Sequence, residues 1–246
     1  MTATIDTIFF DVGNTLRVVK DDPAFAAAAE AELMALTGTT EDHDAFIGKL
    51  TERYEAYRRL SKSRLLDDTE GELWTRHLLP DDCYDPNYIY KIAPQMTRLW
   101  RNHDGPRVAR PDAVNTIREL ARRGYTLGII ANTITETEIP DWMCEAGVAQ
   151  YFKTTILSSK VRLRKPDPAI YHLACRCIGS PESHCAYVGD NPVRDVEGTR
   201  AAGFGLMVRI DEPDTLKKEQ ATGDEFRPDH IIETLSDLLE IFPPLH

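Results

Sequence analysis

The feature that most constrains the fold of this chain is an alternation of short apolar segments with segments of helical periodicity. Residues 125–131, for example, form a largely apolar run that follows a helical pattern ending at Gly124. Strands that alternate with helices indicate a parallel, doubly wound sheet with right-handed crossovers. We therefore expect an α/β fold with strands over 7–12, 125–131, 154–157, 186–189 and 205–210, an edge strand at 231–232, and helices over 114–121, 168–178, 196–202 and 235–241.

Residues 17–107 interrupt this alternation and are rich in helical patterns. Phe46, Leu50, Tyr54 and Tyr57 repeat at spacings of four, four and three, as on the apolar face of an amphipathic helix. The chain is thus predicted to have a doubly wound α/β core and an inserted α-helical domain. We place the core at 1–16 and 108–246 and the inserted domain at 17–107, with helices over 24–36, around 46–57, over 65–79 and over 88–100, and we expect 217–226 to be an exposed loop.

Composition restricts the class of protein further. The 246 residues include 42% apolar and 28% charged residues, an ordinary balance for a soluble globular protein, and no run approaches the length needed to span a membrane. The N-terminus has no signal-peptide pattern, so we expect a cytoplasmic location. The net charge of −11 argues against nucleic-acid binding. The cysteines are odd in number and match no zinc pattern, which favours reduced thiols: Cys83, Cys144, Cys175, Cys177 and Cys185.

Polar residues follow the ends of the predicted strands, where open α/β sheets bind ligands. Asp11 ends the first strand, and alone it would be explained as a turn residue. Asp190 ends the strand at 186–189, and with Asp11 it offers the oxygen ligands that Mg²⁺ prefers. Lys165 precedes Pro166 and is therefore held extended, which suits a lysine directed at a phosphate.

Four motifs, taken in order, resemble the haloacid dehalogenase superfamily over nearly the whole chain. They are Phe10–Leu16, Ile129–Asn132, Lys165–Tyr171 and Val188–Phe204, and the last two are very close matches. The resemblance implies a Rossmann-like core, a mobile helical cap of the first type at 17–107, and Mg²⁺-dependent hydrolysis of a small phosphorylated metabolite.

The resemblance also implies roles for individual residues. Asp11 is expected to be the nucleophile that forms an aspartyl-phosphate, with Lys165 neutralising its charge and that of the phosphate. The metal is expected to bind Asp11, Asp190 and the carbonyl of Gly13. The substrate phosphate is expected to meet Lys165 and the Ala131–Asn132 segment, and the supporting residues are expected to be Asn191 and Asp195.

Two positions depart from the pattern of this superfamily. Gly13 stands where a second aspartate usually protonates the leaving group and activates water, and Ala131 stands where Ser or Thr usually donates a hydrogen bond. A positioned acid/base contributes about 10²–10⁴ in rate, and a donor to developing charge about 10²–10³. Both losses together predict slow turnover, except for substrates with good leaving groups.

Three hypotheses remain open on the sequence. The first is the phosphatase, and the second is a catalytically weakened relative that binds a phosphorylated ligand or a protein partner. The third, ranked last, is a 2-haloacid dehalogenase, which works without metal. The oligomeric state is left as monomer or homodimer. In the inserted domain, the candidates for the missing acid are His43, His77, His103, Tyr54 and Tyr57. The candidates for contacts with an anion are Arg53, Arg58 and Arg59, and none of the eight is singled out.

Overall fold

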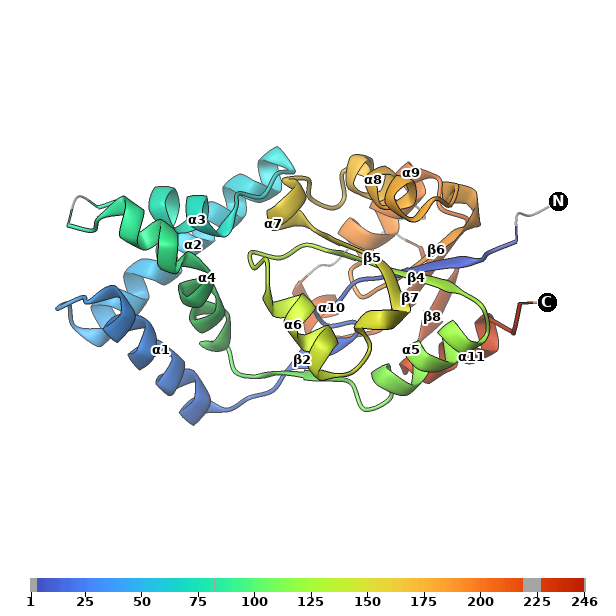
Figure 1. The fold of residues 1–246 in the computed structure, drawn as a ribbon, viewed down its shortest axis with the longest axis horizontal. Coiled ribbons are helices and arrows are strands. Elements are labelled where there is room, and N and C mark those ends of the chain that lie inside the picture. The colour runs from blue at the N-terminus through green and yellow to red at the C-terminus, as the bar shows by residue number, and fades with distance from the viewer. Residues whose placement is uncertain (1–3, 82, 219–226, 246) are drawn as a thin grey trace.

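The predicted strands form one six-stranded parallel sheet in a computed structural model that describes residues 4–81, 83–218 and 227–245. The strand order is β5-β4-β1-β6-β7-β8, so β1 lies between β4 and β6 (Figure 1). The strands are β1 (Thr7–Phe10), β4 (Thr126–Ala131), β5 (Phe152–Leu157), β6 (Cys185–Gly189), β7 (Leu206–Ile210) and β8 (His230–Ile232). The predicted parallel sheet is confirmed, with β8 at its edge.

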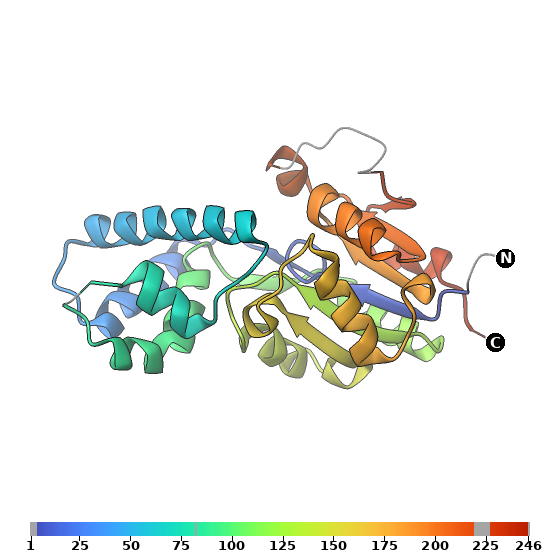
Figure 2. The same ribbon diagram turned by 90° about the horizontal axis from the view of Figure 1, so that it is seen from above.

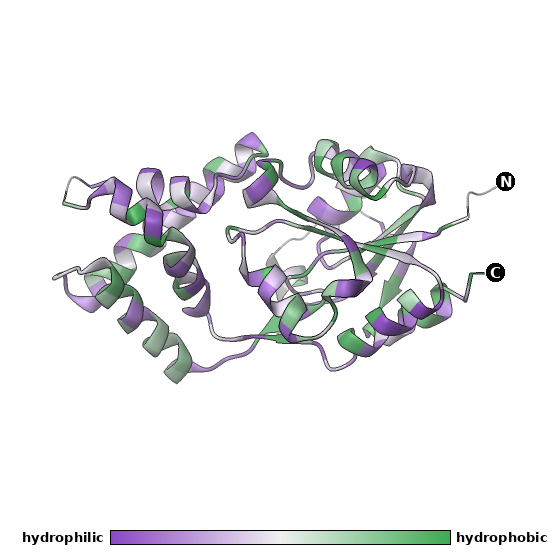
Figure 3. Cartoon of the chain, viewed as in Figure 1, coloured by the Kyte–Doolittle hydropathy of each residue, from purple (hydrophilic) through white to green (hydrophobic). Residues whose placement is uncertain are grey.

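Helices cover both faces of this sheet, as the doubly wound prediction requires. One apolar cluster joins one face to α5 (Ala113–Arg122), α6 (Glu138–Glu145) and α11 (Leu238–Ile241). A second cluster joins the other face to α8 (Pro168–Ile178) and α9 (Gly198–Ala202). Figure 3 shows hydrophobic residues along the strands, because strands covered on both faces have no solvated side. The shorter elements of the core are η2 (Ala149–Tyr151), α7 (Ser158–Val161), η3 (Glu182–His184), η4 (Pro192–Glu197), α10 (Pro213–Lys218) and η6 (Leu235–Asp237).

The inserted helices lie beyond one end of the sheet and have their own apolar core (Figure 2). Trp74 and Trp100 are buried there with Phe46 and Leu50 of the predicted amphipathic stripe. At the base, β2 (Arg17–Val19) pairs antiparallel with β3 (Arg107–Ala109), close to both predicted junctions. We call this unit the helical insertion; it comprises α1 (Pro23–Thr37), α2 (His43–Arg64), α3 (Glu70–Glu72), η1 (Leu73–Leu78) and α4 (Pro86–Asn102).

The predicted helix over 65–79 is wrong at its start. Leu65 has a left-handed backbone (φ 55°) that ends α2, and helix resumes only at Glu70. Thr69 and Glu72 form a capping box there, while the intervening acidic residues Asp67 and Asp68 make ion pairs with arginines. Tertiary ion pairs therefore override the local helical pattern.

Two further details complete the comparison with the predicted elements. The helix expected at 196–202 begins earlier, because Asn191 caps the helical turn η4. Of the loop expected at 217–226, Lys217 and Lys218 belong to α10, and residues 219–226 lie outside the described part of the chain. No helix among the described residues is long and apolar enough to cross a membrane.

Candidate active site

Three buried aspartates converge at the carboxyl edge of the sheet. Asp11 follows β1, Asp190 follows the neighbouring strand β6, and Asp195 lies in η4. One carboxylate oxygen from each lies within 4.8 Å of the others. Since buried carboxylates this close repel one another, the site needs positive charge beside them.

Lys165 supplies the first positive charge. Its side chain is fully buried, with Nζ 3.2 Å from Asp11 Oδ1 and 2.7 Å from Asp195 Oδ1. Nζ also donates to the Tyr187 hydroxyl at 2.6 Å. An ammonium has three donors, so these three oxygens fix its position. The predicted pairing of Lys165 with Asp11 is therefore present in the structure.

Tyr187 is a member of the site that the sequence analysis missed. Its hydroxyl accepts from Lys165 and donates to the carbonyl of Ile130 at 2.8 Å. Burial raises the pKa of Tyr187 well above its ordinary value, and the charges of Asp195 and Asp11 raise it further. The phenol is therefore neutral, and it accepts the hydrogen bond from the lysine without neutralising the lysine's charge. In the sequence it is one residue of an apolar strand, and nothing else marks it.

Asp195 is held by a close approach to the backbone of β6. A Cβ added to Gly189 would lie 2.5 Å from Asp195 Oδ2, so only glycine admits the carboxylate there. The same Oδ2 accepts the backbone N–H of Asn191 at 3.1 Å. The Asn191 side chain in turn caps η4 by accepting two backbone N–H groups. Asp195 thus contacts Lys165 and Asn191 holds the turn that carries Asp195, while their supporting role in catalysis stays a prediction.

Arg194 supplies a second positive charge and was also missed. One of its nitrogens lies 3.4 Å from Asp11 Oδ2 and 3.3 Å from Asp190 Oδ1. Its buried Nε has no hydrogen-bond partner among the described residues. Burial alone would raise the pKa of Asp11, but Lys165 and Arg194 outweigh it and hold that pKa below its ordinary value. Asp11 is therefore ionised near neutral pH.

Asp190 is in a different electrostatic position. Burial, together with the nearby charges of Asp11 and Asp195, raises its pKa to about 7 against the opposing effect of Arg194. Its Oδ2 accepts a hydrogen bond from Thr215, which also accepts from the Asn14 side chain. Thr215 comes from α10, 25 residues along the chain.

Ala131 is the last residue of β4, on the other side of β1 from β6, and Asn132 follows it. The Asn132 side chain donates to the carbonyl of Lys165 at 3.0 Å and accepts its N–H at 2.9 Å. It therefore positions the Lys165 backbone, and the contact of this segment with a substrate phosphate stays a prediction. Ala131 is buried and has no hydroxyl to donate.

Gly13 leaves open space at the site. It is exposed, and a Cβ built on it meets no described heavy atom within 4 Å. Its φ is also outside the positive range seen at other glycines of this chain. A side chain is therefore missing at Gly13 where the surroundings would admit one.

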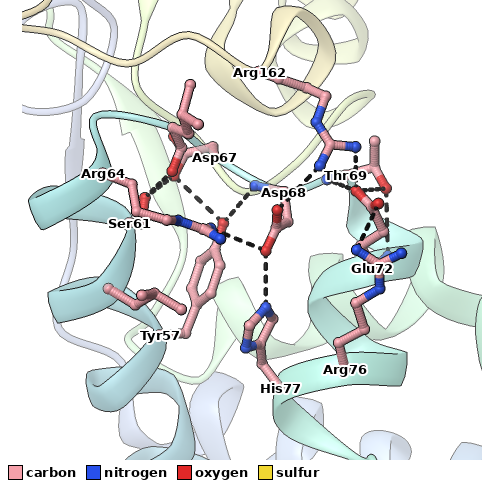
Figure 4. Close-up of polar contacts among 12 residues, drawn as sticks. Tyr57, Ser61, Arg64, Asp67, Asp68, Thr69, Glu72, Arg76, His77 and Arg162 are labelled. Atoms are coloured by element: carbon pink, nitrogen blue, oxygen red, sulfur yellow. Dashed lines mark hydrogen bonds and ion pairs between the residues drawn. The ribbon is translucent and has the colours of Figure 1, made fainter.

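Ion pairs connect the segment just before Lys165 to the helical insertion. Arg162 pairs with Asp68 at 3.2 Å and with Glu72 at 2.5 Å (Figure 4). Arg164, directly before Lys165, donates to the fully buried Asp67 at 2.9 Å. The position of the insertion is therefore coupled to the lysine.

A cleft of about 260 Å³ separates α2 from the site. Lys165, Asn132, Asn191 and Arg194 line it on the core side. Of the candidates in the helical insertion, Arg58 and Arg59 line this cleft, and Tyr54 and Tyr57 line an adjoining one. The others have partners elsewhere: His43 with Glu30, His77 with Asp68, His103 with Trp100 and Arg53 with Asp81.

Comparisons with known proteins agree with this geometry. Residues 5–203 match the family model described as haloacid dehalogenase-like hydrolase. The chain is 34% identical to phosphoserine phosphatase of Thermus thermophilus over 93 residues, 38% of this chain but only 37% of that protein. It is 25% identical to ribulose-1,5-bisphosphate 5-phosphatase of Halopiger xanaduensis, over 95% of this chain and 98% of that protein.

The fold also has relatives among solved structures. A 2-haloacid dehalogenase from Pseudomonas syringae pv. tomato aligns with a TM-score of 0.69 and 24% identity, over 97% of this chain and 98% of that one. At this identity the likeness establishes the fold alone. With the family model covering most of the chain, these findings show that the protein belongs to the haloacid dehalogenase-like hydrolases.

Proposed function

We propose that this chain is a Mg²⁺-dependent phosphatase of small phosphorylated metabolites, with Asp11 as the nucleophile. The observation that carries the proposal is the buried Asp11 carboxylate, 3.2 Å from the ammonium of Lys165, a residue that lines the cleft. Two of the relatives above are named as phosphatases, which supports the same reaction class.

The residues suit attack by a carboxylate on a phosphate. Such an attack brings two anions together, so it needs fixed positive charge at the point of contact. Lys165 and Arg194 provide it, and they also keep Asp11 ionised by lowering its pKa. Tyr187 holds the lysine side chain and Asn132 holds its backbone, so the charge is in place before substrate arrives. The Nε of Arg194 lies 3.9 Å from Asp195 Oδ1 and makes no hydrogen bond with a described residue, so its proton is available to a phosphate oxygen.

The site also fits a magnesium ion. Three buried carboxylates stand within 4.8 Å, and the two Arg194 contacts with Asp11 and Asp190 are long, at 3.4 and 3.3 Å. We assign Asp11, Asp190 and the Gly13 carbonyl as the residues that would hold Mg²⁺. When bound, the ion would neutralise charge on the phosphate.

Gly13 shapes the expected kinetics. Without an acid at this position, esters with poor leaving groups react slowly at the first step. Without a base, water attacks the aspartyl-phosphate of Asp11 slowly at the second. Aryl phosphates, whose leaving groups need no proton, are therefore the better test substrates.

A second candidate is a weakened family member that binds phosphorylated ligands without efficient turnover. The open space at Gly13 and the absence of a hydroxyl on buried Ala131 favour it. It predicts thermal stabilisation by such ligands without product. The dehalogenase ranks third, because the acidic cluster suits a cation that dehalogenation does not need.

Turnover of 4-nitrophenyl phosphate with Mg²⁺, followed by a panel of metabolite phosphates, tests the proposal. We expect activity that chelation removes and that Asp11→Asn abolishes. Chloride release from a 2-haloacid that survives chelation would support the dehalogenase instead. A wild-type protein no more active than Asp11→Asn across the panel would refute the phosphatase.

A further inference from the structure

One face of α2 lies across the cleft from the active site. Glu55, Arg58, Arg59 and Lys62 are spaced at i, i+3, i+4 and i+7, so they share one side of the helix. All four line the cleft that Lys165 lines from the core. The buried residues of α2 pack into the helical insertion and leave this face to the cleft.

The lining of this cleft is cationic in a chain that is acidic overall. Six cations and one carboxylate, Glu55, are among its described lining residues, although the whole chain carries a net charge of −11. A lysine in the last turn of a helix stabilises the helix dipole, which accounts for Lys62. It does not account for Arg58 and Arg59, which lie further from the end of α2 at Arg64.

The cations that line the cleft fall into two groups according to the carboxylates that they contact. On the core side, Lys165 and Arg194 face the aspartates, and Arg164 is paired with Asp67. On α2, Arg58 makes an exposed contact with Glu55 at 2.9 Å. Arg59 has no hydrogen bond or ion pair with any described residue. Among the described residues, Arg58 and Arg59 therefore carry more positive charge than the single carboxylate beside them, Glu55, neutralises.

We infer that Arg58 and Arg59 form a subsite for a second anionic group on the substrate. The inference rests on the proposed function, since it assumes that the first phosphate lies at Asp11. It assigns the substrate to small metabolites that carry a phosphate ester and, at the other end, a second phosphate or a carboxylate. Arginine suits this role because its planar donors match both groups, and a substrate with one phosphate leaves the pair without a partner.

Equilibrium binding to the Asp11→Asn protein tests the subsite without requiring turnover. Calorimetry with Mg²⁺ would compare compounds that differ in the second anion: fructose 6-phosphate with fructose 1,6-bisphosphate, and glycerol 3-phosphate with 3-phosphoglycerate. In at least one pair, the compound with the second anion should bind about tenfold more tightly than the compound without it. A tenfold difference is the lower end for a hydrogen bond to a charged group. The two pairs distinguish a phosphate from a carboxylate.

Variants of the two arginines locate the effect. In the Asp11→Asn background, Arg58→Ala with Arg59→Ala should reduce the preference to about twofold or less, and Arg59→Lys should retain part of it. Arg59→Ala alone removes no described contact, so it separates loss of binding from loss of folding. Lys91→Ala is the matched control, since Lys91 is an exposed cation of α4 outside the cleft lining.

Equal binding within both pairs would overturn the subsite, as would a preference that survives the double arginine replacement. Wild-type turnover of 4-nitrophenyl phosphate, which has no second anion, is measured separately. Its absence would count against the proposed function while the binding result still decides the subsite.

Discussion

Replacing Gly13 by aspartate should restore the acid/base group that this site lacks. The structure admits the side chain, because a Cβ at Gly13 meets no described heavy atom within 4 Å and the backbone is not left-handed. The position is exposed, so the new carboxylate escapes the burial that raises the pKa of Asp190 to about 7. We therefore expect Gly13→Asp to fold and to gain activity.

The size of the gain follows from the missing function. A positioned general acid/base contributes about 10²–10⁴ in rate, and we expect about 10² for an alkyl ester such as glycerol 3-phosphate. The lower end applies because Ala131 still offers no hydroxyl to the phosphoryl group. The added negative charge beside Asp11 also competes with the phosphate and reduces the gain.

Steady-state phosphate release from glycerol 3-phosphate with Mg²⁺ is the assay, with thermal unfolding measured on the same samples. Gly13→Asn is the control, since it has the same size and no carboxylate to exchange a proton. A folded Gly13→Asp protein whose kcat stays within about threefold of wild type would contradict the claim that the missing proton transfer limits cleavage of the P–O bond.

Three further predictions concern charge. Burial would raise the pKa of Glu138, but Arg101, Arg17 and Arg107 hold it at about 2, below the unfolded value. The contribution of ionised Glu138 to the free energy of unfolding is therefore complete above about pH 5 and declines toward pH 2. Glu138→Gln should therefore lower the free energy of unfolding by about 3 kcal/mol at pH 7, and urea titrations should show a smaller difference at pH 3. Lys165→Met should reduce kcat for 4-nitrophenyl phosphate by about 10² or more, with Mg²⁺ titrated to confirm saturation. Asp67→Asn leaves Arg164 without its buried partner and should cost about 3 kcal/mol in urea unfolding, whereas a cost below about 1 kcal/mol would contradict the role given to this ion pair.

Much of the fold follows from local sequence patterns. The strands were recognisable because a doubly wound sheet buries both faces, which leaves apolar runs such as 125–131 between glycines and helices. β2 and β3 were not recognisable, since each has three residues and no periodicity to detect. The start of α3 depended on ion pairs of Asp67 and Asp68 with distant arginines, which a local pattern does not contain.

The residues of the candidate site also fall into two groups: those that sequence patterns identify and those that only the folded chain reveals. Asp11 and Asp190 follow strand ends, where topology brings them to one edge of the sheet, and Lys165 directly precedes a proline. Arg194 and Tyr187 were missed because their roles depend on which way a side chain points from a helical turn or a strand. Asn132 was placed at the site, but its side chain holds the Lys165 backbone, a contact that only the folded chain defines.

The central claim is that Asp11 receives the phosphoryl group. Rapid mixing of wild-type protein with excess 4-nitrophenyl phosphate and Mg²⁺ tests it most directly. Because Gly13 provides no base for the second step, 4-nitrophenolate should appear in a burst of about one equivalent per active site, and acid-quenched protein should carry one phosphoryl group on Asp11. Release without a burst, without phosphoryl on Asp11 and at an equal rate in Asp11→Asn would contradict the account.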